Sequence, residues 1–210
     1  MYLISLFRAP EIFIPLGLIV IFSICSHEFM HAYIALREGD PTAADRGHLT
    51  LNPLRQMGMF SLITFLILGI AWGQVPVNPL RLRSRWSHLR VALAGPLTNV
   101  GLFLIFCALS AAVFAFMENR ELAGRILMQG AALNLVLAFF NLLPVPGLDG
   151  AVVAWYFYPR ILQMRSEWSS GIFLVLLILL FACFDYITAA AEWVSLHLTA
   201  WIFELLRSTR

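Results

Sequence analysis

Long apolar runs separated by short polar stretches dominate the chain and predict a series of membrane-crossing helices. The four clearest runs cover Ile12–Leu36, Val91–Phe116, Ile126–Leu143 and Ser170–Ile187. Each is at least about 18 residues long and predominantly apolar, as a candidate transmembrane helix requires. The runs are continuous rather than alternating, which favours helices over a membrane-embedded β-barrel.

Two further apolar segments fit more than one arrangement. Met57–Trp72 is short, so it either just crosses the bilayer or dips into it and returns. The tail from Ala189 to Leu206 carries Glu192, His197 and Glu204 among apolar residues. This tail suits either a sixth span or an amphipathic helix lying at the interface. We therefore expect an all-α polytopic membrane protein with about five to six transmembrane or re-entrant helices.

The polar stretch at residues 37–55 follows the first run. Its Gly, Pro and Asp residues exclude a continuous helix. The piece HLTLN at 48–52 has weak strand character and predicts a short membrane-associated β-hairpin after the first helix. We expect a single membrane-embedded domain over 1–210, with a core at about 12–158 and C-terminal helices at 168–206.

Composition agrees with this class of protein. Hydrophobic residues make up 60% of the chain and charged residues 12%, whereas soluble domains carry about 25% charged residues. All 14 basic residues are Arg, and a net charge of +2 gives no indication of a nucleic-acid surface. Cys25, Cys107 and Cys183 are scattered through apolar runs, so we expect buried thiols rather than disulfides.

Arginines mark two loops as cytoplasmic by the positive-inside rule. They are Arg37, Arg46 and Arg55 in the first loop, and Arg81, Arg83, Arg85 and Arg90 in the second. Both loops lie on one side only if Met57–Trp72 re-enters, which would also bring Asp149 to the side of His27 and His31. We prefer this re-entrant arrangement, and a plain short span stays open.

The first apolar run contains His27, Glu28 and His31, which read H-E-x-x-H. On a helix, two His residues at i and i+4 share one face and can bind a single ion, and zinc suits imidazole ligands. The neighbouring Glu28 can act as general base toward water. Three ionisable groups inside a spanning helix are costly and indicate a function; the alternative is a polar cluster that only packs helices together.

A catalytic zinc site also needs a third protein ligand and an open position. The candidates in apolar surroundings are Asp149, Asp185, Glu192 and His197. Asp149 follows a turn broken by Pro144 and Pro146, which can aim a carboxylate into the helix bundle. From spacing alone, capping of a helix that begins at Gly150 explains Asp149 equally well. For Glu192 and His197 a solvated helix face is the better explanation.

Three ordered motifs, HEFMH at 27–31, AGPLTN at 94–99 and NLLPVPGLDG at 141–150, resemble those of the site-2 proteases, which are intramembrane zinc metalloproteases. GDPTA at 39–43, GHLTLNPL at 47–54 and PVNP at 76–79 resemble the compact branch of that family, which lacks PDZ and CBS domains. The resemblance covers roughly residues 20 to 155 of the chain.

The resemblance implies a role for each matching residue. His27, His31 and Asp149 would bind one Zn²⁺ ion, and Glu28 would be the catalytic base. Asn99 and Asn141 match family residues assigned to substrate or oxyanion binding, a role that an amide donor can serve. Hydrogen bonding between helices is the alternative for both. The implied hairpin edge could add a strand from the substrate.

The expected activity is that of a zinc endopeptidase which cleaves within or near transmembrane segments of membrane proteins, as in regulated intramembrane proteolysis. The resemblance implies a multi-pass protein of a bacterial or archaeal plasma membrane, with its active site toward the cytoplasm. Partners would be a transmembrane-segment substrate and the lipid bilayer, with no nucleic acid; a homo-oligomer stays open. The alternative is a metal-ion transporter or channel using the same His and Asp residues.

Overall fold

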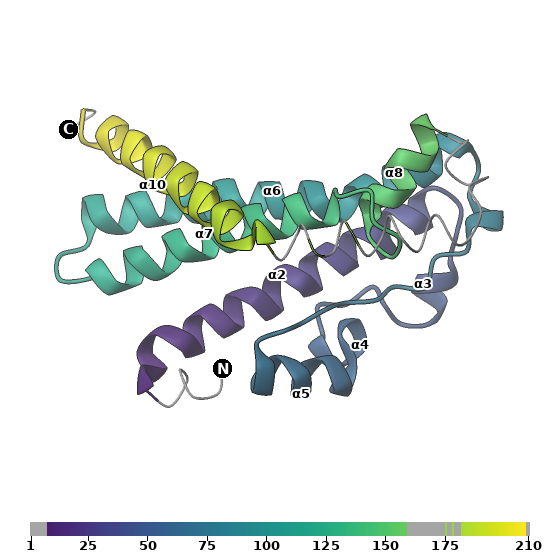
Figure 1. Ribbon diagram of the computed structural model, residues 1–210, viewed down its shortest axis with the longest axis horizontal. Helices are drawn as coiled ribbons and strands as arrows, with labels where there is room; N and C mark the ends of the chain where they lie inside the picture. The colour runs from purple at the N-terminus through teal and green to yellow at the C-terminus, as the bar shows by residue number, and fades with distance from the viewer. Residues whose placement is uncertain (1–7, 159–174, 176–177, 179–181, 209–210) are drawn as a thin grey trace.

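The computed structural model describes residues 8–158, 175, 178 and 182–208 (Figure 1). Within these residues all regular structure is helical. The elements are α2 (Pro10–Arg37), α3 (Thr42–Asp45), α4 (Pro53–Gln56), α5 (Gly58–Leu68), η1 (Pro79–Arg81), α6 (Arg85–Phe116), α7 (Glu121–Asn141), α8 (Asp149–Phe157) and α10 (Phe184–Ser208).

Three of the described helices, α2, α6 and α7, are long and apolar enough to cross a membrane. They correspond to the first three predicted spans, so the expectation of long apolar helices in these three places is confirmed. The predicted total of five to six is not reached in the described residues. Most of the predicted Ser170–Ile187 span, and the start of the C-terminal helices at 168–206, lie outside them.

The long helix α6 begins six residues before the predicted Val91. Ser84 caps its N-terminus, because the Ser84 hydroxyl oxygen accepts a hydrogen bond from the Ser87 backbone N–H. The first turns of α6 therefore carry Arg85 and Arg90 beyond the apolar run. Apolar patterning locates the membrane-embedded part of such a helix but misses a polar extension of this kind.

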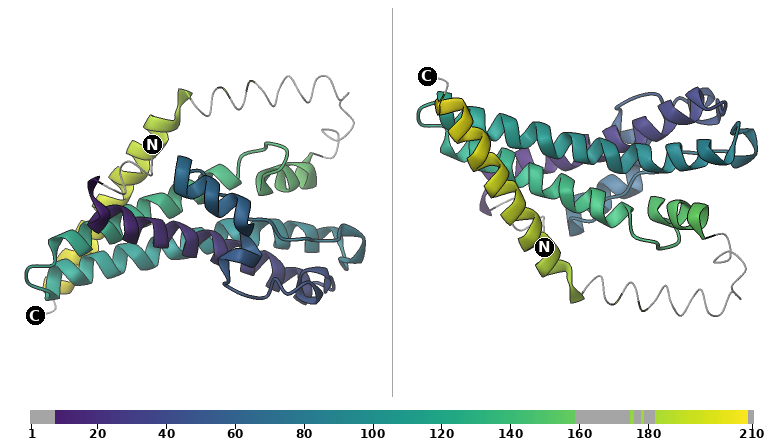
Figure 2. Two further views of the ribbon diagram at one scale, coloured as in Figure 1. Left: turned by 90° about the horizontal axis from the view of Figure 1, so that it is seen from below. Right: turned by 90° about the horizontal axis from the view of Figure 1, so that it is seen from above.

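The described helices pack around the antiparallel pair α6 and α7. Helix α2 lies on one side of this pair and α10 crosses it on the other, as the two views in Figure 2 show. Phe103, Phe106, Cys107 and Ala131 form the buried centre, which Ile19 of α2 and Leu198 of α10 also contact. Small residues on α10 (Ala191, Ser195 and Thr199) are buried, which allows the close helix approach common in membrane proteins.

The predicted β-hairpin is wrong, because the structure contains no strand in the residues that it describes. The Gln56 side chain binds backbone carbonyls that a hairpin would use for pairing between strands. Its Nε2 donates hydrogen bonds to the carbonyls of His48 (2.8 Å) and Thr50 (2.6 Å). Asn52 caps α4 by accepting from the Leu54 N–H, and Pro53 has no N–H to donate. The stretch therefore folds as a loop followed by one helical turn.

Helix α5 has 11 residues, or about 16 Å at 1.5 Å per residue, which is about half of a ~30 Å hydrocarbon core. Gly69 ends it in the left-handed conformation, with φ 79°. The chain then turns back, because the Ser61 hydroxyl bonds to both the N–H and the carbonyl of Trp72, and the Gln74 N–H donates to the Gln56 carbonyl. The segment 57–78 thus leaves and returns on the same side of the bundle.

Asp40 fastens this returning segment to the end of α2. Its side chain is fully buried and accepts hydrogen bonds from the backbone N–H and hydroxyl of Thr42 and from the Asn78 N–H (2.6 Å). Burial alone would raise the pKa of the Asp40 carboxyl, but the bonds from Thr42 and Asn78 outweigh it and lower the pKa. The ionised form of Asp40 therefore stabilises the fold.

We predict that Asp40→Ala lowers the free energy of unfolding by about 1.5–3 kcal/mol, the range for hydrogen bonds to a charged group. The native contribution is fully present above the unfolded Asp pKa of about 3.9 and is lost as the pH falls through the lower folded-state pKa. Thermal unfolding in detergent at pH 7 and pH 3 measures this. Asp45→Asn, at an exposed position on α3, is the control and should behave as wild type. Equal stability of Asp40→Ala and wild type at pH 7 would contradict the assignment.

Candidate metal centre

Three side chains from two distant parts of the chain converge inside the bundle. His27 and His31 project from α2, and Asp149 is the first residue of α8. The His27 Nε2 lies 3.2 Å from Asp149 Oδ2, and the His31 Nε2 lies 3.3 Å from Asp149 Oδ1. One ligand atom from each residue lies within 4.8 Å of the other two. The chain thus offers two imidazoles and one carboxylate to a single point.

The outer ring nitrogens of both histidines contact α6. His31 Nδ1 lies 2.7 Å from the Val91 carbonyl, which can only accept, so His31 carries its proton on Nδ1. His27 Nδ1 lies 2.6 Å from the Asn99 side-chain oxygen, which also accepts. With Nδ1 protonated on each ring, both Nε2 atoms present lone pairs to the centre.

This arrangement fits a bound cation. The two Nε2 atoms are 3.0 Å apart, yet neither carries a proton in the neutral tautomers fixed above, so they cannot hydrogen bond to each other. Asp149 Oδ2 is buried and has no hydrogen-bond donor within the described residues. A positive ion among these atoms would satisfy all of them. Two His and one carboxylate form a known zinc ligand set that leaves an open position.

The Asp149 carboxylate is aimed by the break between α7 and α8. Gly147 has φ 95°, a conformation that favours glycine, and turns the chain after the two prolines. Helix α8 then begins at Asp149 itself, its N-cap residue is Leu148, and no side chain caps it. The capping alternative for Asp149 is therefore not observed, because its oxygens face His27 and His31 instead.

Two glycines give the cluster its space. A Cβ atom added to Gly95 on α6 would lie less than 3.0 Å from the Nε2 atoms of both His27 and His31. A Cβ added to Gly73, in the returning segment, would lie less than 3.0 Å from the Glu28 carboxylate. Glu28 is itself buried one position after His27. The backbone at Gly73 therefore passes directly beside the predicted catalytic base.

The other predicted site residues lie in different positions. Asn99 contacts His27, whereas Asn141 ends α7 and donates from Nδ2 to the Leu137 carbonyl within its own helix. The substrate or oxyanion role of both residues stays a prediction. The rival ligand candidates Asp185, Glu192 and His197 are all exposed on α10. None of the three joins a metal-binding group within the described part of the chain.

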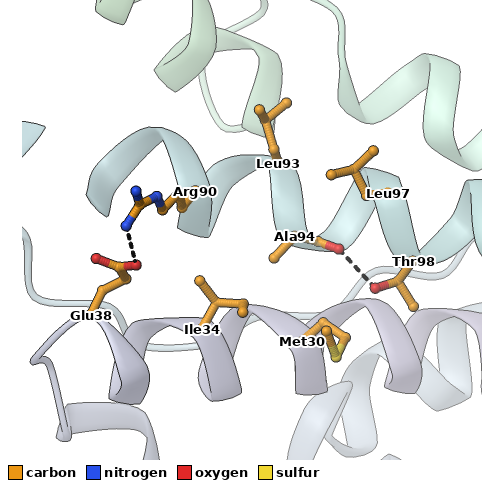
Figure 3. A pocket seen from close by; sticks show the side chains of 8 residues that line it. All are labelled: Met30, Ile34, Glu38, Arg90, Leu93, Ala94, Leu97 and Thr98. Atoms are coloured by element: carbon orange, nitrogen blue, oxygen red, sulfur yellow. Dashed lines mark hydrogen bonds and ion pairs between the residues drawn. The ribbon is translucent and has the colours of Figure 1, made fainter. Parts of the chain in front are cut away.

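An apolar groove with a volume of about 420 Å³ runs between α2 and α6 (Figure 3). Met30 and Ile34 line it from α2, and Leu93 and Leu97 line it from α6. Ala94 and Thr98 also line it, and they lie on either side of Gly95 along α6. The ion pair between Glu38 and Arg90 (2.9 Å) closes one end. The groove therefore lies between α6 and the half of α2 that carries His27 and His31, and it has a charged pair at one end.

Sequence reasoning missed Gly73, Gly95 and Asn134. Gly95 lies within the AGPLTN motif, but a glycine in an apolar helix gives no sign of what it faces. Asn134 offered a clearer signal, because an amide inside an apolar run requires a hydrogen-bond partner. Its partners are Asn99, Ser23 and the Gly130 carbonyl.

Comparison with known proteins identifies several relatives. The chain is 34% identical over 171 residues to YwhC of Bacillus subtilis, covering 76% of this chain and 77% of that protein. It is 34% identical over 170 residues to Rip2 of Mycolicibacterium smegmatis, covering 74% and 63%. It is 42% identical over 67 residues to MJ0611 of Methanocaldococcus jannaschii, covering 31% and 33%. All three carry the name "putative zinc metalloprotease".

The chain thus spans about three quarters of YwhC and less than two thirds of Rip2. No family model matches the chain, and no solved structure matches it at a significant level.

Proposed function

Because the chain belongs to the family of zinc metalloproteases that includes YwhC and Rip2, we propose that it is an intramembrane protease of the site-2 type. Its substrates are transmembrane segments of other membrane proteins, and its place is regulated intramembrane proteolysis in a bacterial or archaeal plasma membrane. One zinc ion per chain is held by His27, His31 and Asp149.

The depth of the metal centre along α2 carries this proposal. His31 and His27 lie six and ten residues before Arg37, the last residue of a helix apolar enough to span a membrane. At 1.5 Å per residue this places them about 9–15 Å from that end of the helix. If α2 spans the bilayer, the ligands therefore lie within the hydrocarbon region. A peptide bond cleaved there belongs to a membrane-embedded segment.

In this proposal, the metal ion, its three ligands and Glu28 have separate roles in peptide hydrolysis. A bound zinc ion would supply Lewis acidity to the scissile carbonyl and to an attacking water molecule. His27, His31 and Asp149 hold the ion and leave a position open for these groups. Glu28 takes the proton of the attacking water on its carboxylate and delivers it to the leaving amine. The apolar groove between α2 and α6 suits an apolar substrate beside the centre.

We propose that the ends of α2 and α6 near the metal centre face the cytoplasm. They meet there, because the Arg83 N–H donates to the Glu38 carbonyl and Arg90 pairs with Glu38. This end carries five arginines, whereas the α6–α7 turn and the first helical turns of α7 carry two. The five are Arg37, Arg81, Arg83, Arg85 and Arg90, and the two are Arg120 and Arg125. The positive-inside rule supports this orientation. In it, α5 and the returning segment are re-entrant.

A metal-ion transporter is the competing function, and the relatives' names do not favour it. A transport path needs several ligand groups in series along the membrane normal. Within the described residues the metal-binding side chains form one compact group.

The proposed function is tested by adding purified full-length protein to proteoliposomes that contain a model protein with one transmembrane segment. We expect zinc-dependent cleavage within or near that segment, located by mass spectrometry of the products. A chelator should stop cleavage and added zinc should restore it. An unfolded soluble protein is the control substrate.

Cleavage of the soluble substrate alone would contradict the intramembrane assignment. Zinc flux across the vesicle membrane without any proteolysis would establish the transporter instead.

A further inference from the structure

Three polar side chains in three apolar helices form a chain of hydrogen bonds that ends on a metal ligand. Ser23 of α2, Asn99 of α6 and Asn134 of α7 are each fully buried. Asn99 Nδ2 lies 3.0 Å from Asn134 Oδ1, and Asn134 Nδ2 lies 2.9 Å from the Ser23 hydroxyl. At its other end Asn99 Oδ1 lies 2.6 Å from His27 Nδ1.

Backbone carbonyls fix the direction of every bond in this chain. Asn134 Nδ2 also lies 2.9 Å from the Gly130 carbonyl, and the Ser23 hydroxyl lies 2.7 Å from the Ile19 carbonyl. A carbonyl can only accept, so the group facing Gly130 must be the NH₂ of Asn134, and Ser23 must donate to Ile19. The remaining Ser23 lone pairs then accept from Asn134.

The same logic extends to the histidine. With its NH₂ turned toward Gly130, Asn134 presents its oxygen to Asn99, so Asn99 must present its own NH₂ to that oxygen. The Asn99 oxygen then faces His27 and requires a proton on Nδ1. His27 is therefore left with an unprotonated Nε2 at the metal centre. If Asn99 turned over, its NH₂ would face Nδ1 and the ring proton would sit on Nε2, where it blocks metal binding.

We propose that Asn134, acting through Asn99, is a positioning residue that selects the metal-binding tautomer of His27. His31 needs no such chain, because its Nδ1 donates directly to the Val91 carbonyl. Hydrogen-bond partners of ligating histidines commonly fix the tautomer and the ring orientation. Here the selection for His27 originates at the Gly130 carbonyl on α7, a helix that contributes no ligand. The inference rests on the metal binding of the proposed function.

The alternative explanation is that Asn99 and Asn134 have a purely structural role and only hold helices together. Ser110 provides a matched control, because its buried hydroxyl donates to the Gly124 carbonyl and so also joins α6 to the start of α7, away from the metal centre. Ser110→Ala removes an interhelical hydrogen bond without touching a ligand's partner. Asn99→Asp provides a second comparison, because it keeps an acceptor facing His27 while losing the donor to Asn134.

The experiment measures zinc affinity of the purified full-length variants by competition with a chelator. We expect Asn134→Leu and Asn99→Leu to bind zinc about 10- to 100-fold more weakly than wild type, the usual cost of losing an outer-shell partner. Asn99→Asp should bind at least as tightly as wild type, and Ser110→Ala should be unchanged. Unchanged affinity in Asn134→Leu, with a loss of thermal stability like that of Ser110→Ala, would overturn the proposal.

A second measurement remains if the Asn134 variants do not fold. Nitrogen-15 NMR of the zinc-free wild-type protein reports the His27 tautomer, assigned by comparison with the His27→Ala spectrum. We expect the proton on Nδ1; a proton on Nε2 would overturn the proposal. Neither readout requires proteolysis. Failure of wild type to bind zinc would instead contradict the proposed function, so the two failures are distinguishable.

Discussion

Glu28→Gln is expected to slow peptide-bond cleavage by about 10²- to 10⁴-fold, the range for loss of a general base, while zinc stays bound. Glutamine has nearly the shape of glutamate, so it fits the narrow space beside Gly73. It cannot take the proton of an attacking water. The three proposed ligands are unchanged, so the metal content should equal that of wild type.

The measurement is the single-turnover rate of cleavage of a transmembrane substrate, with metal content determined on the same sample. Glu38→Gln is the control, because Glu38 directly follows the last residue of α2 and pairs with Arg90 and Ser87, away from His27, His31 and Asp149. That variant should keep the wild-type chemical rate. If Glu28→Gln cleaves as fast as wild type, Glu28 is not the base.

Gly95→Ala is expected to abolish stable zinc binding although no ligand is changed. The added Cβ would lie less than 3.0 Å from the Nε2 atoms of His27 and His31, in the space where the ion and its ligands meet. Zinc affinity should fall by more than the about 10- to 100-fold that outer-shell mutations cost. Helix propensity would instead favour the variant, because alanine is more stable than glycine in a helix interior by about 1 kcal/mol.

Gly101→Ala is the matched control for this prediction. Gly101 lies on the same helix, and a Cβ added there has no neighbour within 4 Å. It should bind zinc as wild type does. Pro96 follows Gly95 and disfavours helical geometry for a residue that has a Cβ, so the stability of zinc-free Gly95→Ala must be measured separately from its affinity. Wild-type affinity in Gly95→Ala would show that the site has more room than the structure indicates.

The parts of the fold that sequence could predict are those governed by apolar length. Helices α2, α6 and α7 match predicted runs. Their hydropathy and length depend only on consecutive residues and not on contacts between distant parts of the chain. The loop at 48–56 could not be predicted in this way. Its strand-like pattern was overridden by Gln56, whose amide binds two backbone carbonyls six and eight residues earlier.

The site divides along the same line. His27 and His31 meet because four residues make about one helical turn, which the sequence contains. The position of Asp149 beside the two histidines was implied only by the family resemblance. From spacing alone, helix capping explained Asp149 as well as metal ligation did. The clearance at Gly95 and the partners of Asn134 depend on how α6 packs against α2 and α7, and a single chain carries no direct sign of that packing.

The three proposed metal ligands lie far apart along the chain, so the ribosome makes them at different times. Asp149 follows His31 by 118 residues, and α6 and α7 lie between them. A chain that has emerged only as far as α7 offers the imidazoles of His27 and His31 to a metal ion but not yet the carboxylate of Asp149. Metal capture by all three ligands therefore requires that α8 has been made and has docked. During its own biogenesis the protein stays without its complete metal centre until the bundle has assembled around that centre.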